Sequence, residues 1–353
     1  MISLNTRIQA FDTLGKLLQQ IGENNVQEDN SNGKLMLLEQ AVVDAPHYNG
    51  WFIEENARYM LAALGKSLTK VKLEKWIEPY KHGLEKGKKA STVGVVMAGN
   101  VPVVGFHDFL SVLISGNKIL AKLSSDDEKL LPLIADLLID IEPEFKEMVE
   151  YTSNRLTDFD AIIATGSNNT SRYFEYYFGK YPNIIRKNRN SIALITGDET
   201  DDDLQNLSKD IFRYFGLGCR NVSHILIPKG HDLNNMLRIF SLNEEVTINH
   251  KYFNNYEYNK AIYLVNSKKH FDTGNLLLTE DSSFSSPVSV IHYEYYNDIN
   301  SANRLLEVNS SKIQCVVTKS NLVKDAVPLG FSQSPELWDY ADGIDTMKFL
   351  IDL

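Results

Sequence analysis

The first third of the chain shows the hydrophobic periodicity of amphipathic helices. Apolar residues recur at helical spacing over residues 8–21, which predicts an opening helix there. A polar linker is expected over residues 24–33, followed by helices at 35–43 and 51–64. The basic stretch 81–89 is interpreted as a solvated turn, after which the pattern changes.

From residue 92 onward, short apolar runs alternate with helical segments. Strands are predicted at 93–98, 118–123, 161–165, 191–195 and 222–228, and helices at 106–114, 126–139, after 168, and at 204–215. The last third is mixed, with further strands predicted at 261–265, 287–292 and 313–318. Strands and helices that alternate at this spacing form parallel sheets with crossover connections. The pattern therefore predicts an α/β protein of two lobes that begins with helices.

Composition excludes several classes of protein. With 353 residues, 43% of them hydrophobic, the chain can bury the cores of two lobes. A net charge of −10 argues against a broad surface for nucleic acid or anionic membranes. The N-terminus has no long apolar core, and polar residues interrupt the most hydrophobic region, 93–123, so we predict neither an export signal nor a membrane span. Cys219 and Cys315 lie far apart, which predicts no disulfide framework, no metal site and a cytoplasmic location.

The stretch 215–224 places Cys219 on a glycine-rich loop between a helical segment and a β-branched run. Gly216 and Gly218 let the backbone bend so that amide N–H groups face an incoming oxygen, and the small neighbours admit a flat carbonyl carbon. The adjacent Arg220 would help to stabilise a thiolate. The alternative is an inert, buried thiol in an ordinary turn, and this stretch alone leaves both interpretations open.

Four patches in order along the chain resemble the aldehyde dehydrogenase superfamily, and most closely its LuxC-like acyl-CoA reductases. They are Gly99-Asn100-Val101-Pro102 with 116–118 and 122–125, then 164–167, then the Cys219 loop, then Ser286-Pro287-Val288; residues 330–335 resemble the closing segment. The resemblance implies a two-lobed aldehyde-dehydrogenase-like fold. Residues 1–189 would hold the N-terminal helices and a Rossmann-type dinucleotide-binding domain, and 190–353 a catalytic domain whose last segment returns to the first lobe. A homodimer is also implied.

The resemblance assigns catalytic roles to three residues. Cys219 would be the nucleophile, and Asn100 would donate a side-chain N–H to the oxyanion alongside the backbone N–H of Cys219. A tetrahedral oxyanion needs fixed donors, and the loss of one typically raises the barrier by about 3 kcal/mol. His107, about two helical turns beyond Asn100, is predicted to protonate the developing alkoxide. The simpler alternatives are an Asx-turn for Asn100 and a structural role for His107. His224 and Cys315 are predicted to be structural.

The cofactor residues also follow from the resemblance. Lys122 matches the lysine that reaches the adenosine ribose, and Ser124 and Ser125 stand where members that prefer NAD often carry an acid. Serine hydroxyls can instead hydrogen-bond a 2′-phosphate, so NADPH is favoured over NADH. Gly166 and Ser167 end a predicted strand and open a helix, so their N–H groups would face a pyrophosphate. An ordinary helix N-cap is the alternative.

Departures from the family pattern narrow the predicted reaction. Relatives that hydrolyse the thioester carry a glutamate base at a position that falls here within 186–190, which holds no acid. Without that base an acyl-enzyme would be released by hydride or by a thiol, which favours reduction of an acyl-CoA over oxidation of an aldehyde. The basic cluster 186–190 would either meet CoA phosphates or form a solvated loop. The glutamate that binds the nicotinamide-side ribose is also absent at 282–284, and Ser171 replaces a glycine. The alternatives are an acyl-phosphate reductase, like glutamyl phosphate reductase, and a non-catalytic protein that binds a dinucleotide or acyl-CoA.

Overall fold

The computed structural model describes residues 2–26, 33–85 and 89–353. The chain divides into two compact units. Unit 1 consists of Met1–Lys187 and Glu336–Leu353, and unit 2 of Asn188–Pro335. The last 18 residues thus belong to the same unit as the first 187.

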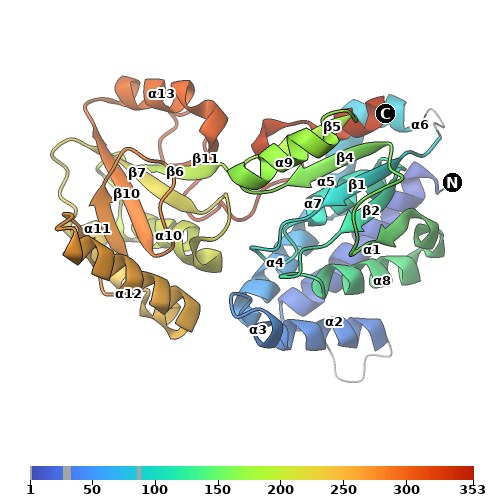
Figure 1. Cartoon of the computed structure of the whole chain (residues 1–353), viewed down its shortest axis with the longest axis horizontal. Helices are drawn as coiled ribbons and strands as arrows, with labels where there is room; N and C mark the ends of the chain where they lie inside the picture. Colours follow the sequence, from blue (N-terminus) through green and yellow to red (C-terminus); the bar gives the residue numbers. More distant parts are fainter. Residues whose placement is uncertain (1, 27–32, 86–88) are drawn as a thin grey trace. The chain divides into compact units, whose positions relative to one another are not determined.

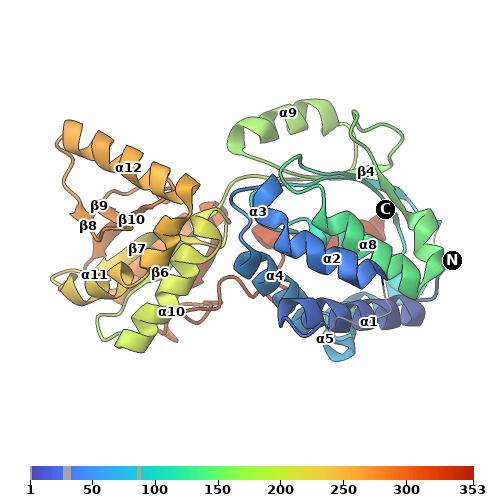
Figure 2. The same cartoon turned by 90° about the horizontal axis from the view of Figure 1, so that it is seen from below.

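Unit 1 begins with a group of helices. They are α1 (Leu4–Gly22), α2 (Gly33–Val43), α3 (Ala45–Tyr48), α4 (Glu54–Ser67), α5 (Lys70–Ile77), the 3-10 helix η1 (Glu78–Tyr80) and α6 (Lys81–Glu85). The apolar face of α1 is fully buried at Phe11, Leu14 and Leu18, as its periodicity predicts. Figure 2 shows α1 beside α5 and α2 beside α8 (Leu130–Ile141).

Two predictions in this region need correction. The helix expected from residue 51 begins at Glu54, after a turn, and the stretch expected to be a solvated turn from residue 81 is helical through Glu85. Residues 27–32 of the predicted linker and 86–88 of the basic stretch lie outside the described residues.

The sheet of unit 1 is wholly parallel. Its strands are β1 (Thr92–Val96), β2 (Lys118–Lys122), β3 (Val149–Tyr151), β4 (Ala161–Thr165) and β5 (Asn183–Arg186), in the order β3-β2-β1-β4-β5. Helices α7 (Phe106–Ile114), α8, α9 (Asn168–Phe178) and α14 (Thr346–Asp352) and the 3-10 helices η2 (Pro143–Met148) and η6 (Ala341–Gly343) complete the unit (Figure 1). The strand order turns back between β1 and β4. In open α/β sheets, ligands bind outside the carboxyl ends of strands at such a switch point.

Unit 2 contains a second sheet, of six strands. They are β6 (Asn190–Leu194), β7 (Val222–Pro228), β8 (Phe271–Asp272), β9 (Leu277–Glu280), β10 (Val290–Tyr296) and β11 (Ile313–Val317), in the order β11-β6-β7-β10-β9-β8. Only the pair β8–β9 is antiparallel. The helices are α10 (Asp201–Phe212), α11 (Asn234–Ser241), α12 (His250–Val265), α13 (Ile299–Val308) and the 3-10 turns η3 (Arg213–Gly216), η4 (Glu244–Ile248) and η5 (Ser310–Lys312). Figure 1 shows α13 on one face of this sheet and α10 and α11 on the other.

The predicted strand at 261–265 is wrong, because these residues form the last turn of α12. The apolar run suggests a strand, but Tyr252, Tyr256 and Tyr263 lie four and seven residues apart and bury one helical face. The helix expected from residue 126 begins at Leu130, because 124–127 form a turn. The strand expected from residue 287 begins at Val290, after Ser289 takes a φ of +63°.

The remaining predicted strands and helices agree with the structure to within about four residues. The mixed α/β class, with two parallel sheets preceded by N-terminal helices, is confirmed. No helix in the described part of the chain is long and apolar enough to cross a bilayer.

Candidate active site

The predicted cofactor residues and Asn100 lie at one edge of the unit 1 sheet. Asn100 is in the loop that follows β1, Lys122 ends β2 with Ser124 just beyond it, and Gly166 and Ser167 follow β4. Strand β1 pairs in parallel with both β2 and β4, so all three loops leave the same, carboxyl edge. This edge includes the switch point, where ligands of such sheets bind.

The first two of these loops touch each other. Met97 N–H donates to the carbonyl oxygen of Lys122 over 3.0 Å. Gly99 is buried, and a Cβ at that position would lie 2.5 Å from Ser124 Oγ, which is too close for any side chain. Asn100 itself is exposed. The glycine therefore permits the close approach of the loop that presents Asn100 to the loop that presents Ser124.

The third loop is a strand-to-helix turn of two residues. Ser167 is the N-cap of α9, and its hydroxyl accepts the N–H of Thr170 over 3.2 Å. Ser171 is buried, and its N–H donates to the Ser167 carbonyl over 2.8 Å. The N-cap role of Ser167 is confirmed, and contact of Gly166 and Ser167 with a pyrophosphate stays a prediction.

His107 contacts the C-terminal segment. Its Nε2 lies 2.9 Å from the carbonyl oxygen of Leu337, and its ring centroid lies 5.5 Å from that of Trp76 and 5.7 Å from that of Tyr340. Trp76 Nε1 also donates to the Tyr340 hydroxyl over 2.8 Å. These contacts favour the structural alternative for His107, which holds the returning segment against α5 and α7.

The basic cluster 186–190 is not uniformly solvated. Arg186 is 4% exposed and forms a double ion pair with Asp108, with N···O distances of 2.5 and 2.8 Å, and donates to Thr346 Oγ1 over 3.0 Å. Lys187 pairs with Glu175 at 2.8 Å on the surface. The expectation of a solvated loop is therefore wrong for Arg186, whose guanidinium is engaged inside unit 1.

In unit 2, Cys219 is exposed just before the amino end of β7, so it is not the buried residue of the alternative interpretation. The chain reaches it through a left-handed run in which Tyr214, Phe215 and Gly216 have φ angles of +53°, +57° and +75°. Two successive aromatic residues in this region are unusual, because the left-handed conformation is strained for residues with a Cβ. Surrounding contacts must therefore hold this turn.

Asn221 supplies those contacts from inside the loop. It is 2% exposed, and its Oδ1 accepts the N–H of Gly218 over 2.8 Å. Its Nδ2 lies 2.7, 3.1 and 3.3 Å from the carbonyl oxygens of Arg213, Asp210 and Ile211. One side chain thus satisfies carbonyl groups at the end of α10 and also fixes the loop that carries Cys219.

Ser191 holds the same loop from the sheet. Its hydroxyl donates to the Cys219 carbonyl oxygen over 2.9 Å and lies 3.1 Å from Cys315 Sγ. Cys315 is half-buried on β11. The sequence did not identify Ser191 or assign a role to Asn221; the one available signal was the position of Asn221 two residues after Cys219.

Two histidines contact the segment 282–284, where the resemblance led us to look for the glutamate that binds the nicotinamide-side ribose. Nδ1 of His224 and Nδ1 of His292 lie 3.1 and 2.8 Å from the carbonyl oxygen of Ser283. His224 is fully buried, and burial lowers its pKa to about 4, so its ring is neutral near pH 7. Ser223 Oγ also donates to the Phe284 carbonyl over 2.6 Å. His224 therefore has the structural role that was predicted for it.

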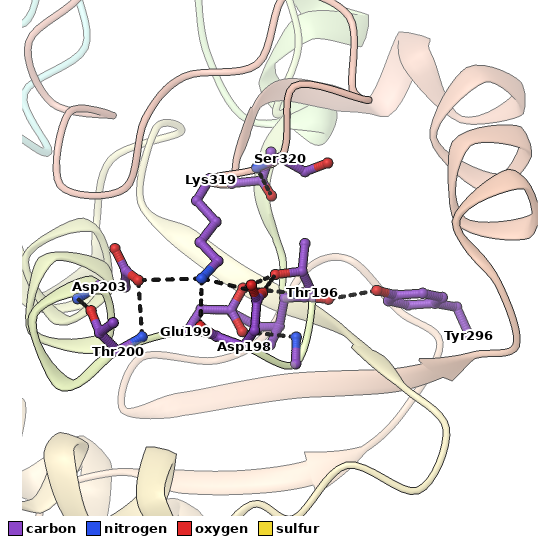
Figure 3. A network of polar contacts seen from close by, with 11 residues as sticks. Thr196, Asp198, Glu199, Thr200, Asp203, Tyr296, Lys319 and Ser320 are labelled. Carbon is purple, nitrogen blue, oxygen red and sulfur yellow. Dashed lines mark hydrogen bonds and ion pairs between the residues drawn. The ribbon is translucent and has the colours of Figure 1, made fainter.

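A polar network lies at the carboxyl end of β6 and β11 (Figure 3). Lys319 Nζ lies 3.2 Å from Asp198 Oδ1 and 3.6 Å from Asp203 Oδ2. Glu199 accepts the N–H groups of Thr196 over 2.7 Å and Gly197 over 2.9 Å. Cys219 lies at the amino end of β7, at the other edge of this sheet, so the network supports the start of α10 and does not form part of the cysteine site.

The fold and these loops define an α/β protein with a Rossmann-type sheet in one unit and an exposed, fixed cysteine in the other. The family model described as acyl-CoA reductase (LuxC) matches residues 34–242, and the chain belongs to this family. It is therefore an aldehyde-forming oxidoreductase that acts on acyl-CoA. A search of curated protein sequences gives no match.

Solved structures of aldehyde dehydrogenases have the same fold. Aldehyde dehydrogenase 21 from Physcomitrella patens, in complex with succinate, superposes with a TM-score of 0.65 at 14% identity over 97% of this chain and 84% of that one. The NAD-dependent benzaldehyde dehydrogenase from Corynebacterium glutamicum gives 0.62 at 11% identity over 91% and 77%. An aldehyde dehydrogenase of Mycobacterium tuberculosis complexed with NAD+ gives 0.56 at 13% identity over 90% and 74%. These similarities confirm the aldehyde-dehydrogenase-like fold.

Proposed function

We propose that this acyl-CoA reductase works through a covalent acyl-enzyme on Cys219. The observation that supports this most directly is an exposed thiol on a loop that Asn221 and Ser191 hold from two sides. A nucleophile must be accessible and held in a fixed position, and both conditions are met here.

The thiolate of Cys219 attacks the thioester carbonyl carbon, and a new C–S bond forms. The bond from that carbon to the sulfur of CoA then breaks, and CoA leaves as a thiolate that takes a proton from solvent. The negative charge on the carbonyl oxygen needs fixed N–H donors. We assign this role to the side-chain amide of Asn100 and the backbone N–H of Cys219.

Reduction requires a hydride donor, and we propose a nicotinamide dinucleotide held by Lys122, Ser124, Gly166 and Ser167. The carboxyl edge of the unit 1 sheet fits this group, because it combines the switch point with the N-terminus of the 11-residue helix α9. When bound, the dinucleotide supplies the hydride that converts the acyl group into an aldehyde and releases the Cys219 thiolate.

We further propose that NADPH is preferred over NADH. The two residues after Leu123 are serines, and Ser125 is exposed at the edge where the ribose would lie. A hydroxyl can donate to a 2′-phosphate, whereas a carboxylate repels it. Ser125→Glu is the variant of choice, because Ser125 is exposed, whereas Ser124 lies against Gly99 of the Asn100 loop.

Initial-rate measurements with both cofactors test this preference. The wild type is expected to show the higher kcat/KM with NADPH, and Ser125→Glu to lower kcat/KM for NADPH by about tenfold while that for NADH changes little. Equal cofactor preference in the wild type and Ser125→Glu would contradict this assignment.

A direct comparison of acyl-CoA with acyl phosphate tests the leaving group. We expect the wild type to oxidise NADPH when acyl-CoA is the substrate. This activity should depend on Cys219, so Cys219→Ala should be inactive. Turnover with an acyl phosphate alone would support the alternative reaction. A wild type that binds acyl-CoA but neither reduces it nor forms an adduct would support a binding protein.

A further inference from the structure

Asp127 lies directly behind the loop that carries Asn100. It belongs to the turn between β2 and α8 and is 6% exposed. Its Oδ2 accepts the backbone N–H of Val103 over 2.6 Å. Val103 is itself 2% exposed and stands three residues after Asn100. The carboxylate thus contacts the Asn100 loop through the backbone and not through a side chain.

Val103 needs such a contact because its backbone is strained. It has a φ of +54°, in the left-handed region that β-branched residues seldom adopt. Its N–H is held by Asp127, and its carbonyl oxygen accepts the N–H of Phe106 over 3.0 Å at the start of α7. These two bonds fix the direction in which the chain leaves the Asn100 turn.

Asp127 also belongs to the loop that is proposed to bind the cofactor. The backbone N–H of Asp127 donates to the Ser124 carbonyl oxygen over 3.0 Å, and the N–H of Asp126 donates to Ser124 Oγ over 3.3 Å. Asp127 therefore joins two loops of the carboxyl edge: its backbone closes the turn that presents Ser124, and its side chain holds the turn that presents Asn100.

The buried carboxyl group of Asp127 costs free energy of folding. Asp127 Oδ1 is buried and has no hydrogen-bond partner among the described residues. Burial raises the pKa of Asp127 to about 7, although the Val103 N–H opposes that shift. A buried carboxyl oxygen without a hydrogen-bond partner destabilises the fold, and groups with strongly shifted pKa values cluster at functional sites.

We propose that Asp127 is a positioning residue for the reaction, which fixes the Asn100 loop through Val103 so that the Asn100 amide is held for the oxyanion. The proposal rests on the proposed function of Asn100 and Cys219. Asp127 does not touch the substrate, so its removal should weaken only those steps in which an oxyanion forms.

Two reactions of the same thiol separate this role from a general effect on folding. Acylation of Cys219 by an acyl-CoA passes through an oxyanion, whereas alkylation by iodoacetamide does not. For Asp127→Ala we expect acylation to slow by about tenfold to a hundredfold, since the oxyanion donor is misplaced but not removed. Alkylation should stay within about twofold of the wild type, because the thiol itself is unchanged.

Three further variants sharpen the test. Asp127→Asn keeps an oxygen acceptor for the Val103 N–H and should restore acylation to within about threefold. Asp126→Ala, the exposed neighbour in the same turn, is the matched control and should behave as wild type. Adding Asp127→Ala to Asn100→Ala should slow acylation no further, because the two residues act as one unit.

Acylation by Asp127→Ala at the wild-type rate, equal slowing of both thiol reactions, or additive effects in the double variant would each overturn the proposal. If Asp127→Ala does not fold, Asp127→Glu is used, whose extra methylene displaces the acceptor and should again slow acylation alone. A wild type that is never acylated would instead overturn the proposed function of Cys219, which keeps the two failures distinct.

Discussion

The hydroxyl of Ser191 donates a hydrogen bond of 2.9 Å to the carbonyl oxygen of Cys219. Ser191 is fully buried near the start of β6 and pairs with Val222, three residues after the cysteine. The peptide group of the proposed nucleophile is therefore hydrogen-bonded to the amino end of strand β6, inside the sheet. This attachment explains how an exposed thiol can sit on a strained loop and still keep a defined position.

Ser191→Ala removes this attachment. The Cys219 carbonyl loses its donor, so we expect the free energy of unfolding to fall by about 1 kcal/mol. Acylation of Cys219 should slow by about threefold to tenfold as the loop loses its fixed position. Cys315→Ala is the matched control, because it removes the other neighbour of the Ser191 hydroxyl and leaves the bond to Cys219 intact. A Cys315→Ala variant that is acylated more slowly than Ser191→Ala would contradict this account.

The ion pair between Arg186 and Asp108 is expected to support folding and not CoA binding. Asp108→Ala leaves a guanidinium buried without its carboxylate, and the loss of one partner of a buried pair typically destabilises by about 3 to 5 kcal/mol. The exposed pair of Lys187 with Glu175 is the control, and Lys187→Ala should change stability by less than about 1 kcal/mol. Urea unfolding measures both. A stable Asp108→Ala variant with a raised KM for acyl-CoA would show that the cluster binds substrate instead.

The sequence predicted most of the fold because its signals were local. Short apolar runs at 161–165 and 222–228 and helical spacing at 8–21 and 106–114 each define an element from neighbouring residues. The prediction was wrong at 261–265, where an apolar run is compatible with strand and helix alike. The burial of three tyrosines of α12 in the folded protein favours the helix, and this burial cannot be recognised in the sequence.

The candidate site was predictable only in part, for a physical reason. Cys219 and Asn100 stand in short motifs that can be recognised in the chain, but the residues that hold them act over long separations. Ser191 reaches Cys219 across 28 positions, and Asp127 reaches Val103 across 24. Such contacts depend on which strands become neighbours, and spacing in a single sequence carries no information about that. The buried pairing of Arg186 with Asp108, 78 positions apart, was hidden for the same reason.

The stability of unit 2 is expected to fall in mild acid because of His224. Its pKa is lowered from 6.5 to about 4 by burial, so the unfolded chain binds a proton between these values that the folded chain does not. Stability from this group is present above pH 6.5 and is lost as the pH falls towards 4. Between pH 7 and pH 5 the loss should be about 2 kcal/mol.

His224→Gln is the variant that isolates this effect, since the amide keeps a donor for the Ser283 carbonyl and does not titrate. Urea unfolding of both proteins at pH 7 and pH 5 should show a smaller loss for the variant. His292 also has a pKa lowered by burial, so part of the acid sensitivity remains in His224→Gln. Equal losses in the two proteins would contradict the assignment to His224.

The central claim, that Cys219 carries the acyl group, is tested most directly by intact-protein mass spectrometry. Wild type and Cys219→Ala are incubated with acyl-CoAs of increasing chain length without cofactor. The wild type should gain the mass of one acyl group, Cys219→Ala should gain none, and addition of NADPH should remove the adduct and release an aldehyde. No adduct on the wild type with any acyl-CoA, or the same adduct on Cys219→Ala, would contradict covalent catalysis at Cys219.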